Sequence, residues 1–391
     1  MRTFTVEERR ARLAVRHHLT PSTKRMDIAS VARTFVGLHA TDPATVFLSA
    51  AARMKRPTIE SIEAALYDER AAVRLLAMRR TMFVVPTDLI PMVHAAASHA
   101  VAANERKRLV SWIDAAGFTK DASRWLRKVS AAAVAELERR GVATTAEIVK
   151  AVPDLQRRIV LGPRTNWQTE QNIGPRVLLV LAAEGLIARS RPLGSWTSTQ
   201  HRWAPMSSWL PDGVAPVPAA EARAQLVERW LRAFGPAPAS DVKWWTGWTL
   251  GATRAALTAA GAVEVDLDGA TGVAMPDDLE PTNAPRPWVA LLPALDTTVM
   301  GWQTRDWFLG DHAPRLFDRS GNAGPTVWWN GRVVGGWAHR ADGEVVWHLF
   351  EDVGRDATSA IEVRARELSE WLGDRRFTPR FRTPLERELS K

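Results

Sequence analysis

The amino-acid sequence predicts an α+β protein with three tandem winged-helix domains and a C-terminal antiparallel β-barrel. The first observation is a pattern of helix, short helix, helix and β-hairpin that recurs along residues 1–278. The second is a change of sequence pattern after Pro276, where several prolines are followed by strand and turn signals. We therefore expect four domains, at residues 1–127, 128–210, 211–278 and 279–391.

The pattern is clearest in the middle unit. Residues 131–138 are typical of a helix that Gly141 closes. Thr144 and Glu147 have the spacing of a capping box, which opens a short second helix. The third helix opens at Gly174-Pro175, and residues 187–198 indicate the strand, turn and strand of a wing.

The third unit repeats this order. Apolar residues at helical spacing predict a first helix, which Gly235-Pro236 ends. Ser240-Asp241 starts a short helix, and residues 250–260 form the third. Residues 263–267 alternate as a strand, and Asp268-Gly269 is a signal for a tight hairpin turn.

The first unit is less regular. Its predicted elements are helices at 9–19, 27–38 and 59–67 and wing strands at 72–76 and 81–85. Residues 86–127 are expected to be mostly helical connectors.

The C-terminal region has the strongest hairpin signal of the chain. Asn330-Gly331 separates two β-rich runs, and Ala341-Asp342-Gly343 joins a second pair of strands. Residues 357–372 have the apolar stripe of a closing helix. We expect the small antiparallel sheet to curl into a barrel.

Composition narrows the class of protein. The 391 residues include no cysteine, which excludes disulfides and thiolate metal sites and favours a cytoplasmic location. The first ten residues lack the apolar core of a signal peptide, and no stretch has the roughly 18 uncharged apolar residues of a membrane helix. We expect no membrane association.

The net charge of +9 indicates a polyanionic partner, and nucleic acid is the commonest one. A winged helix places its third helix in the major groove, so the repeated unit predicts double-stranded DNA as the partner. Three tandem modules cover a long surface without dimerisation, which predicts a monomer. The candidate DNA-binding residues are Arg79, Arg80, Arg176, Arg189, Arg191, Arg202, Lys243, Arg305 and Arg332. The alternative is a solvated face on each helix, and winged helices also serve as protein-interaction modules.

The chain shows no common cofactor or metal motif. It lacks an H-E-x-x-H pair, a P-loop and a G-x-S-x-G elbow, and the adjacent His17 and His18 do not easily bind one ion. Residues 321–324 are ordinary turn signals. We therefore predict no metal and no cofactor.

One junction is polar where the periodicity predicts core. Residues 37–43 read Gly-Leu-His-Ala-Thr-Asp-Pro at the expected end of a helix, which makes His39, Thr41 and Asp42 the candidate catalytic residues. The structural alternative is that His39 caps this helix while Thr41 or Asp42 N-caps the next one. Spacing alone favours the structural alternative.

Four passages resemble the AlkZ/YcaQ-type winged-helix DNA glycosylases, bacterial enzymes that excise alkylated bases and unhook interstrand crosslinks. They are residues 37–41 (family G-L-Q-A-Q), 78–86 (R-G-T-x-H-x-V), 174–203 (the middle winged helix), and 291–305 with 325–336 (L-P-x-x-D and P-T-x-x-x-G-R-V-x-G). The resemblance spans nearly the whole chain and implies three winged helices around a β-barrel.

The resemblance also implies a catalytic pair, which in the family is a glutamine followed two residues later by glutamine or aspartate. These positions hold His39 and Thr41 here, and Asp42 stands one residue late. Phe83 replaces a frequent histidine, and Arg80 replaces a glycine.

The activity that the resemblance implies is a monofunctional DNA glycosylase for cationic N7- or N3-alkylpurine adducts, including bulky or crosslinked ones. In this hypothesis neutral His39 holds or deprotonates the attacking water, Thr41 hydrogen-bonds it, and Asp42 stabilises the sugar cation. Asp296, which follows an apolar run, is interpreted as a buried structural residue.

Two other functions stay open. A non-catalytic DNA-binding protein, either a regulator or a lesion shield, is favoured by the departure of His39-Ala40-Thr41 from the catalytic motif. A resistance protein that sequesters a genotoxin directly is the third hypothesis.

Overall fold

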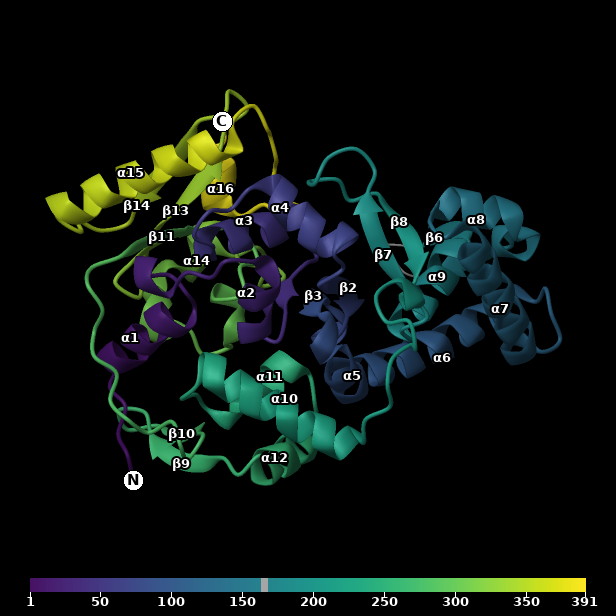
Figure 1. The fold of residues 1–391 in the computed structure, drawn as a ribbon, viewed down its shortest axis with the longest axis horizontal. Coiled ribbons are helices and arrows are strands. Elements are labelled where there is room, and N and C mark those ends of the chain that lie inside the picture. The colour runs from purple at the N-terminus through teal and green to yellow at the C-terminus, as the bar shows by residue number, and fades with distance from the viewer. Residues whose placement is uncertain (163–167) are drawn as a thin grey trace.

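A six-stranded sheet joins the first two units of the chain. The computed structural model describes residues 1–162 and 168–391 (Figure 1). The strands follow the order β1 (Leu38–His39), β3 (Met82–Pro86), β2 (Ala72–Leu76), β7 (Ile187–Pro192), β8 (His201–Pro205) and β4 (Ala143–Thr144). The two hairpins meet where β2 pairs with β7, so the two units share one sheet.

The helices of the first unit pack around its wing. They are α1 (Val6–Arg16), α2 (Ile28–Thr34), α3 (Pro43–Arg53) and α4 (Ile59–Glu63), which a π-helical turn extends through Asp68. The wing strands expected at 72–76 and 81–85 are confirmed within one residue.

The helix expected at residues 27–38 is wrong at its C-terminal end. Val36 has a φ of +68°, which ends the helix, and Leu38 and His39 instead pair with Val84 and Phe83 as β1. Gly37 permits this approach, because a Cβ there would lie 3.0 Å from the Val84 carbonyl oxygen. The path places His39 on a strand.

Apolar periodicity does not predict helix α3, although the suggested N-cap at Thr41 or Asp42 implies a helix that begins there. Pro43 and the seven residues after it are all buried, so the helix lacks the polar face that helical periodicity detects. Asp42 N-caps it by accepting a hydrogen bond from the Ala44 amide at 3.1 Å.

The second unit has the expected order with one addition. The connector holds α5 (Ile90–Val93) and α6 (His99–Ala116), and the unit continues through α7 (Ala122–Arg140), α8 (Thr145–Ala151) and α9 (Gly174–Ala183). The Thr144 and Glu147 capping box is confirmed. The unexpected hairpin of β5 (Arg158–Leu161) and β6 (Thr169–Asn172) lies before α9, and its second strand, Thr-Glu-Gln-Asn, has no apolar alternation to detect.

The third unit matches the prediction closely. It contains α10 (Ala219–Phe234), α11 (Ala239–Thr246), α12 (Leu250–Ala259), β9 (Val263–Asp266) and β10 (Thr271–Ala274). Asp268 and Gly269 both have positive φ, at +59° and +94°, as the tight hairpin turn requires.

The C-terminal strands form an open sheet. β11 (Val289–Leu292), β12 (Thr326–Trp329), β13 (Arg332–His339) and β14 (Val345–Leu349) follow one another as an antiparallel meander. The helices are α13 (Asp306–Leu309), α14 (Ala313–Leu316), α15 (Arg355–Leu372) and α16 (Pro384–Leu389). The expected closed barrel is not found among the described residues. A barrel requires its first and last strands to pair, whereas here α15 packs against both β11 and β14.

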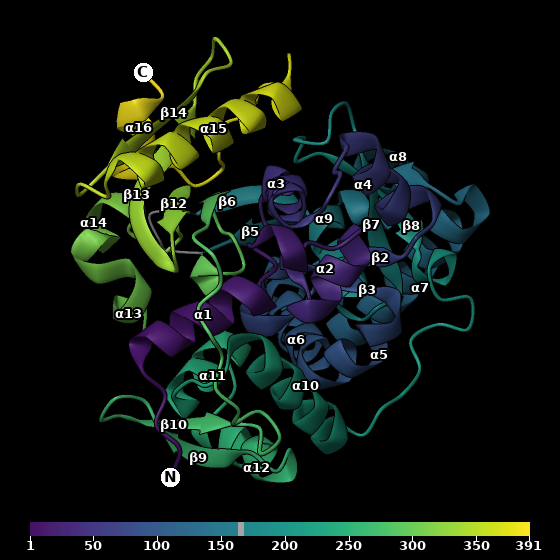
Figure 2. The same cartoon turned by 60° about the vertical axis from the view of Figure 1, so that its left-hand side comes forward.

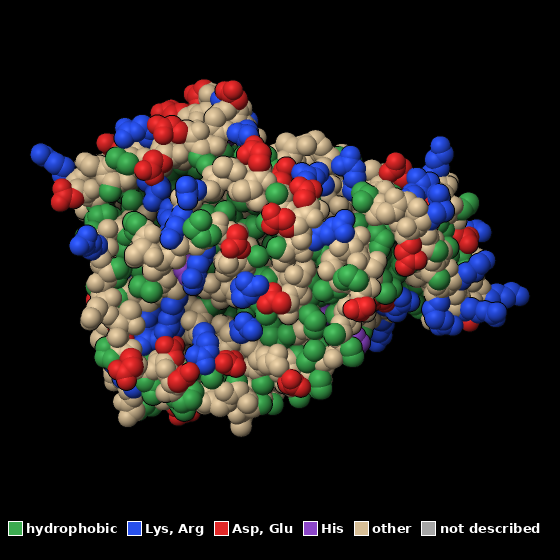
Figure 3. Space-filling model, viewed as in Figure 1, with side chains coloured by type: hydrophobic (Ala, Val, Ile, Leu, Met, Phe, Trp, Pro, Cys, Tyr) green, Lys and Arg blue, Asp and Glu red, His purple; other side chains and the backbone are tan. Residues whose placement is uncertain are grey.

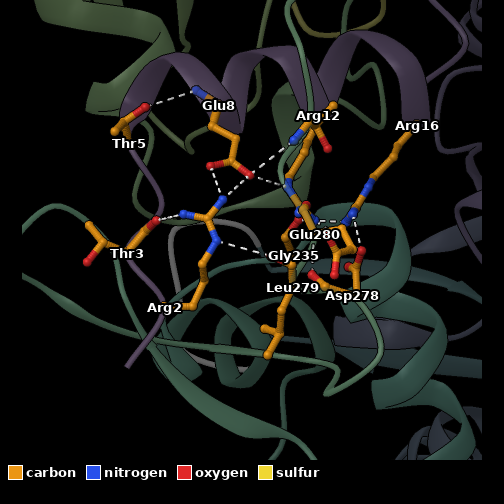
Figure 4. Close-up of polar contacts among 11 residues, drawn as sticks. Arg2, Thr3, Thr5, Glu8, Arg12, Arg16, Gly235, Asp278, Leu279 and Glu280 are labelled. Atoms are coloured by element: carbon orange, nitrogen blue, oxygen red, sulfur yellow. Dashed lines mark hydrogen bonds and ion pairs between the residues drawn. The ribbon is translucent and has the colours of Figure 1, made fainter.

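Helix α1 is tied to the C-terminal end of the third unit (Figure 4). Arg12 is 2% exposed and donates to the Asp278 carboxylate at 3.0 Å. Arg16 reaches the same carboxylate, and Arg2 pairs with Glu8 at 2.6 Å. Figure 2 shows the N-terminal segment running beside β9 and β10, where Thr3 bridges to Asp266. The start of the chain therefore belongs spatially with the third unit.

None of the helices in residues 1–162 and 168–391 combines the length and apolarity that crossing a bilayer requires.

Candidate active-site pocket

A cavity of about 310 Å³ has His39 in its wall. Distant parts of the chain form this wall: Arg79 comes from the turn between β2 and β3, Trp244 from α11, and Arg305, Ser320 and Asn322 from the C-terminal region. None of the described residues that line it is Asp or Glu. The described part of the lining is therefore cationic and includes no carboxylate.

The backbone fixes His39 in this wall. It pairs with Phe83 across β1 and β3, and its amide donates a hydrogen bond to the Thr297 hydroxyl at 3.1 Å. The imidazole is 6% exposed and lies 5.7 Å from the Phe83 ring, measured between centroids. Its Nδ1 atom is buried without a hydrogen-bond partner. The imidazole therefore has a free polar atom.

Burial sets the protonation state of His39. Desolvation, assisted by the Arg79 cation and opposed by Asp296, lowers its pKa to about 3. The imidazole is therefore neutral near pH 7 and a weak base. It can hold a water molecule by a hydrogen bond, but it has little capacity to take a proton from it.

Two arginines flank Trp244 at the pocket. The guanidinium carbons of Arg79 and Arg305 lie 3.8 and 5.1 Å from the centroid of its ring. Burial lowers the pKa of each to about 10, so both remain charged at neutral pH. Nε of Arg79 and Nη2 of Arg305 are buried without partners, and within the described ranges neither side chain forms an ion pair. Such a pair of cations is suited to binding an anion.

Thr41 and Asp42 do not line this pocket. One Asp42 oxygen accepts from the Ala44 amide and the other from the Arg380 amide at 2.8 Å, while burial raises its pKa. The N-cap that the sequence suggested for Asp42 is thus confirmed, whereas the cap suggested for His39 is wrong because His39 lies in a strand. Thr41 is half-buried, and its carbonyl accepts from Arg380 at 3.4 Å.

Only Arg79 and Arg305 of the nine candidate DNA-binding residues join His39 in the pocket. Three others are neutralised by carboxylates: Arg80 pairs with Glu105, Arg191 with Glu63 and Asp68, and Arg332 with Glu351. The rest are dispersed: Arg176 lies over Trp112, Arg202 donates to the Pro192 carbonyl, Lys243 is exposed, and Arg189 lies opposite Arg74.

A second cavity, of about 760 Å³, adjoins the first through the shared residue Ser320. Its cations are Arg319, Arg380, Arg382 and Arg387. Figure 3 shows Lys and Arg side chains over much of one face, with a group at its right-hand end and a vertical band over its left part. The second cavity therefore adds arginines beside the pocket, although Asp318 also lines it and Arg382 pairs with Glu386.

A buried ion pair supports the wall behind His39. Asp296 and Arg53 are both fully buried and pair at 2.6 Å. Asp296 also accepts from the Thr298 amide at 2.8 Å, and the intervening Thr297 holds the His39 backbone. The structural interpretation of Asp296 is confirmed. Sequence analysis missed Arg53, although an arginine in an otherwise apolar stretch was a signal.

Other pocket residues also escape sequence analysis. The sequence pattern places Trp244 in a helix without indicating a role, and it predicts Gly321 and Asn322 only as ordinary turn residues. In residues 1–162 and 168–391, no group of three or more His, Asp or Glu side chains is arranged to hold a metal ion.

A neutral imidazole lies beside two arginines that form no ion pair within the described ranges, next to a cavity lined by further arginines. Such a set of groups suits an anionic polymer such as a nucleic acid. A family model described as "DNA glycosylase AlkZ-like" matches residues 32–371, and the chain belongs to this family. The resemblance found in the sequence is thereby confirmed.

The solved structure of Streptomyces sahachiroi DNA glycosylase AlkZ has the same fold. It superposes with a TM-score of 0.74 at 21% sequence identity, covering 96% of this chain and 98% of that one. A comparison with the curated proteins found no match.

Proposed function

We propose that this protein is a monofunctional DNA glycosylase that removes cationic N7- or N3-alkylpurines from double-stranded DNA by water attack at C1′. The observation that carries the proposal is the neutral, partly unpartnered His39 beside Arg79 and Arg305 in one pocket. Membership of the AlkZ-like family supports it.

The proposed chemistry needs no acid. The bond between C1′ and the purine nitrogen breaks, and its electron pair neutralises the positive charge of the alkylated base. Water then adds to C1′ and releases its extra proton to solvent. His39 holds this water by a hydrogen bond, because a pKa of about 3 makes it a poor proton acceptor.

The described lining of the pocket restricts the substrate. It includes no Asp or Glu, so none of these lining residues offers a carboxylate to contact the sugar cation. The reaction must then rely on a base that departs easily, which an alkylated cationic purine does and an unmodified base does not. The adjoining cavity of about 760 Å³ offers room for bulky or crosslinked adducts.

The finer architecture follows from the same proposal. The three helix and hairpin units act as winged helices at residues 1–127, 128–210 and 211–278, and residues 279–391 complete the pocket with Arg305. The protein acts as a cytoplasmic monomer that associates with the nucleoid when it binds DNA, and it repairs alkylation damage or protects against a genotoxin.

The test is base release from a duplex that carries an N7-alkylguanine, detected as strand breaks after alkali treatment. Replacing His39 by Ala should slow release by about 10²–10³-fold, as expected when a group that acts in the transition state is removed. Affinity for the same duplex should change little. His99→Ala, which removes an exposed histidine, is the matched control.

Wild-type protein that yields no breaks above the spontaneous rate, across small and bulky adducts, would refute the enzyme. One observation favours the alternative of a DNA-binding protein without activity: both oxygens of Asp42 are occupied by backbone amides. A footprint with defined sequence preference and no base release would establish that alternative.

A further inference from the structure

The seam between the first two units brings two arginines together. Arg74 of β2 is directly opposite Arg189 of β7. Like charges at paired positions of a sheet repel and destabilise it. Arg74 is 6% exposed, so water does little to screen its charge. The arrangement therefore needs a reason beyond folding.

No carboxylate neutralises this pair in the part of the chain that the structure describes. Nε and Nη2 of Arg74 are buried without hydrogen-bond partners. Asp42 is near enough for Arg74 to affect its pKa, but its oxygens accept from the Ala44 and Arg380 amides. Arg191, two residues along the same strand, shows the contrast, because it is fully paired with carboxylates.

Further unpartnered polar atoms surround the two arginines. The Tyr67 hydroxyl is buried without a partner, and the Arg74 cation opposes the rise in its pKa that burial causes. Nε2 of His201 also lacks a partner, although Nδ1 is hydrogen-bonded to the Thr199 carbonyl at 3.2 Å. Burial, Arg189 and Arg74 together lower the pKa of His201 to about 4. The charges that act on His201 are both arginines, whereas Tyr67 faces Glu63 as well as Arg74 and Arg191.

This cluster is distinct from the pocket of His39. Leu38, Val84, Arg74 and Arg189 form one row across four strands, because each is paired with the next. Side chains in such a row share one face of the sheet. His39 follows Leu38, so its side chain lies on the opposite face.

We propose that Arg74 and Arg189, with the Tyr67 hydroxyl, form a binding site for a phosphate group. Two guanidinium groups offer paired N–H donors that match phosphate oxygens, and the bound anion removes their mutual repulsion. The phosphate comes either from the backbone of bound DNA or from free phosphate. Only the DNA source rests on the proposed function.

The experiment compares wild-type protein with Arg74→Gln/Arg189→Gln. Arg232→Gln, which removes one charge from an exposed ion pair on α10, is the control. The first arm measures Tm with inorganic phosphate or with chloride at equal ionic strength. The second arm measures the affinity for an undamaged duplex over a range of salt concentrations.

The double substitution should raise the Tm in chloride but remove the rise in Tm that phosphate causes. Without phosphate the double variant should melt at a higher temperature than wild type, because the repulsion is gone. A free-phosphate site predicts that phosphate raises the Tm of wild type and not that of the double variant. A DNA site predicts that the slope of log Kd against log salt decreases by about 1 for each DNA phosphate that the variant no longer binds.

Three results would overturn the proposal. The first is a double variant that is less stable than wild type in chloride. The second is an equal response of wild type and double variant in both arms, and the third is an Arg232→Gln control that changes as much as the double variant. A double variant that fails to fold counts as the first of these results, because the proposal expects it to be more stable than wild type in chloride. Base release is a separate measurement, so its absence in wild type would refute the enzyme and leave this site standing.

Discussion

Two arginine clusters near β1, one fully buried and one half-buried, differ in how their charge is neutralised. Arg53 is fully buried and donates to both oxygens of Asp296, to the Thr298 hydroxyl and to the His17 carbonyl. Arg79 and Arg305 flank Trp244 beside the same strand, and each has a buried donor without a partner, although Nε of Arg305 donates to the Trp302 carbonyl at 2.7 Å. Both clusters lose hydration, yet only the first regains the lost interactions inside the protein.

The difference separates a structural cluster from a binding one. A fully satisfied network makes the fold specific and needs nothing from outside. Unpaired buried donors reduce stability and persist where a ligand supplies the missing partner. The same criterion distinguishes the paired Arg191 from the unpaired Arg74.

The largest expected effect is on the structural cluster. Asp296→Ala leaves the charge of Arg53 unpaired in the interior, which should lower the free energy of unfolding by about 3–5 kcal/mol. Urea denaturation measures it. Replacing both residues by apolar ones, as in Arg53→Met/Asp296→Leu, should recover part of the loss. A loss below about 1 kcal/mol for Asp296→Ala would contradict the structural role of this cluster, because an exposed ion pair contributes that much to stability.

The next effect concerns the protonation of His39. Its pKa is about 3 in the folded protein and 6.5 in its unperturbed state, so between these values the unfolded chain binds one more proton. Stability should therefore decrease as the pH falls through this window and should be unaffected above it. His39→Gln should reduce the slope of the unfolding free energy against pH by about 1.4 kcal/mol per pH unit, because the unfolded chain then binds one proton fewer. Equal slopes, measured by denaturation at several pH values, would place His39 in contact with solvent.

The smallest effect distinguishes capping from catalysis at Asp42. Asp42→Ala should lower the free energy of unfolding by about 1 kcal/mol, because α3 loses its N-cap. Base release, corrected for folded protein, should stay within a few-fold of wild type. A loss comparable to that of His39→Ala would return Asp42 to the active site.

Local signals made much of the fold predictable. Asp268-Gly269 and Asn330-Gly331 were sufficient for two hairpins, because a tight turn with positive φ selects these residues. The capping box of Thr144 was equally reliable, since its bonds span three residues. Long-range pairing was not predictable: nothing near Arg74 indicates that it lies opposite Arg189. The prediction of a closed barrel was wrong for the same reason: closure of a sheet depends on which distant strands pair.

The site was predictable only in part. Charge and the family resemblance led to His39, Arg79 and Arg305, which the structure brings together. They did not reveal that both oxygens of Asp42 accept hydrogen bonds from backbone amides, because one of those amides belongs to Arg380, which is distant in the sequence. Trp244 was missed because a tryptophan in a short helix is usually a core residue.

The attachment of α1 has a consequence for biosynthesis. The carboxylate that Arg12 binds lies 266 residues further along the chain. During translation the N-terminal helix emerges early but cannot complete its contacts until Asp278 has left the ribosome. Proteins usually fold domain by domain from the N-terminus during synthesis. Here the contacts of the first helix are completed only after residue 278 has been synthesised. A nascent chain arrested before Asp278 should therefore expose α1 to proteases.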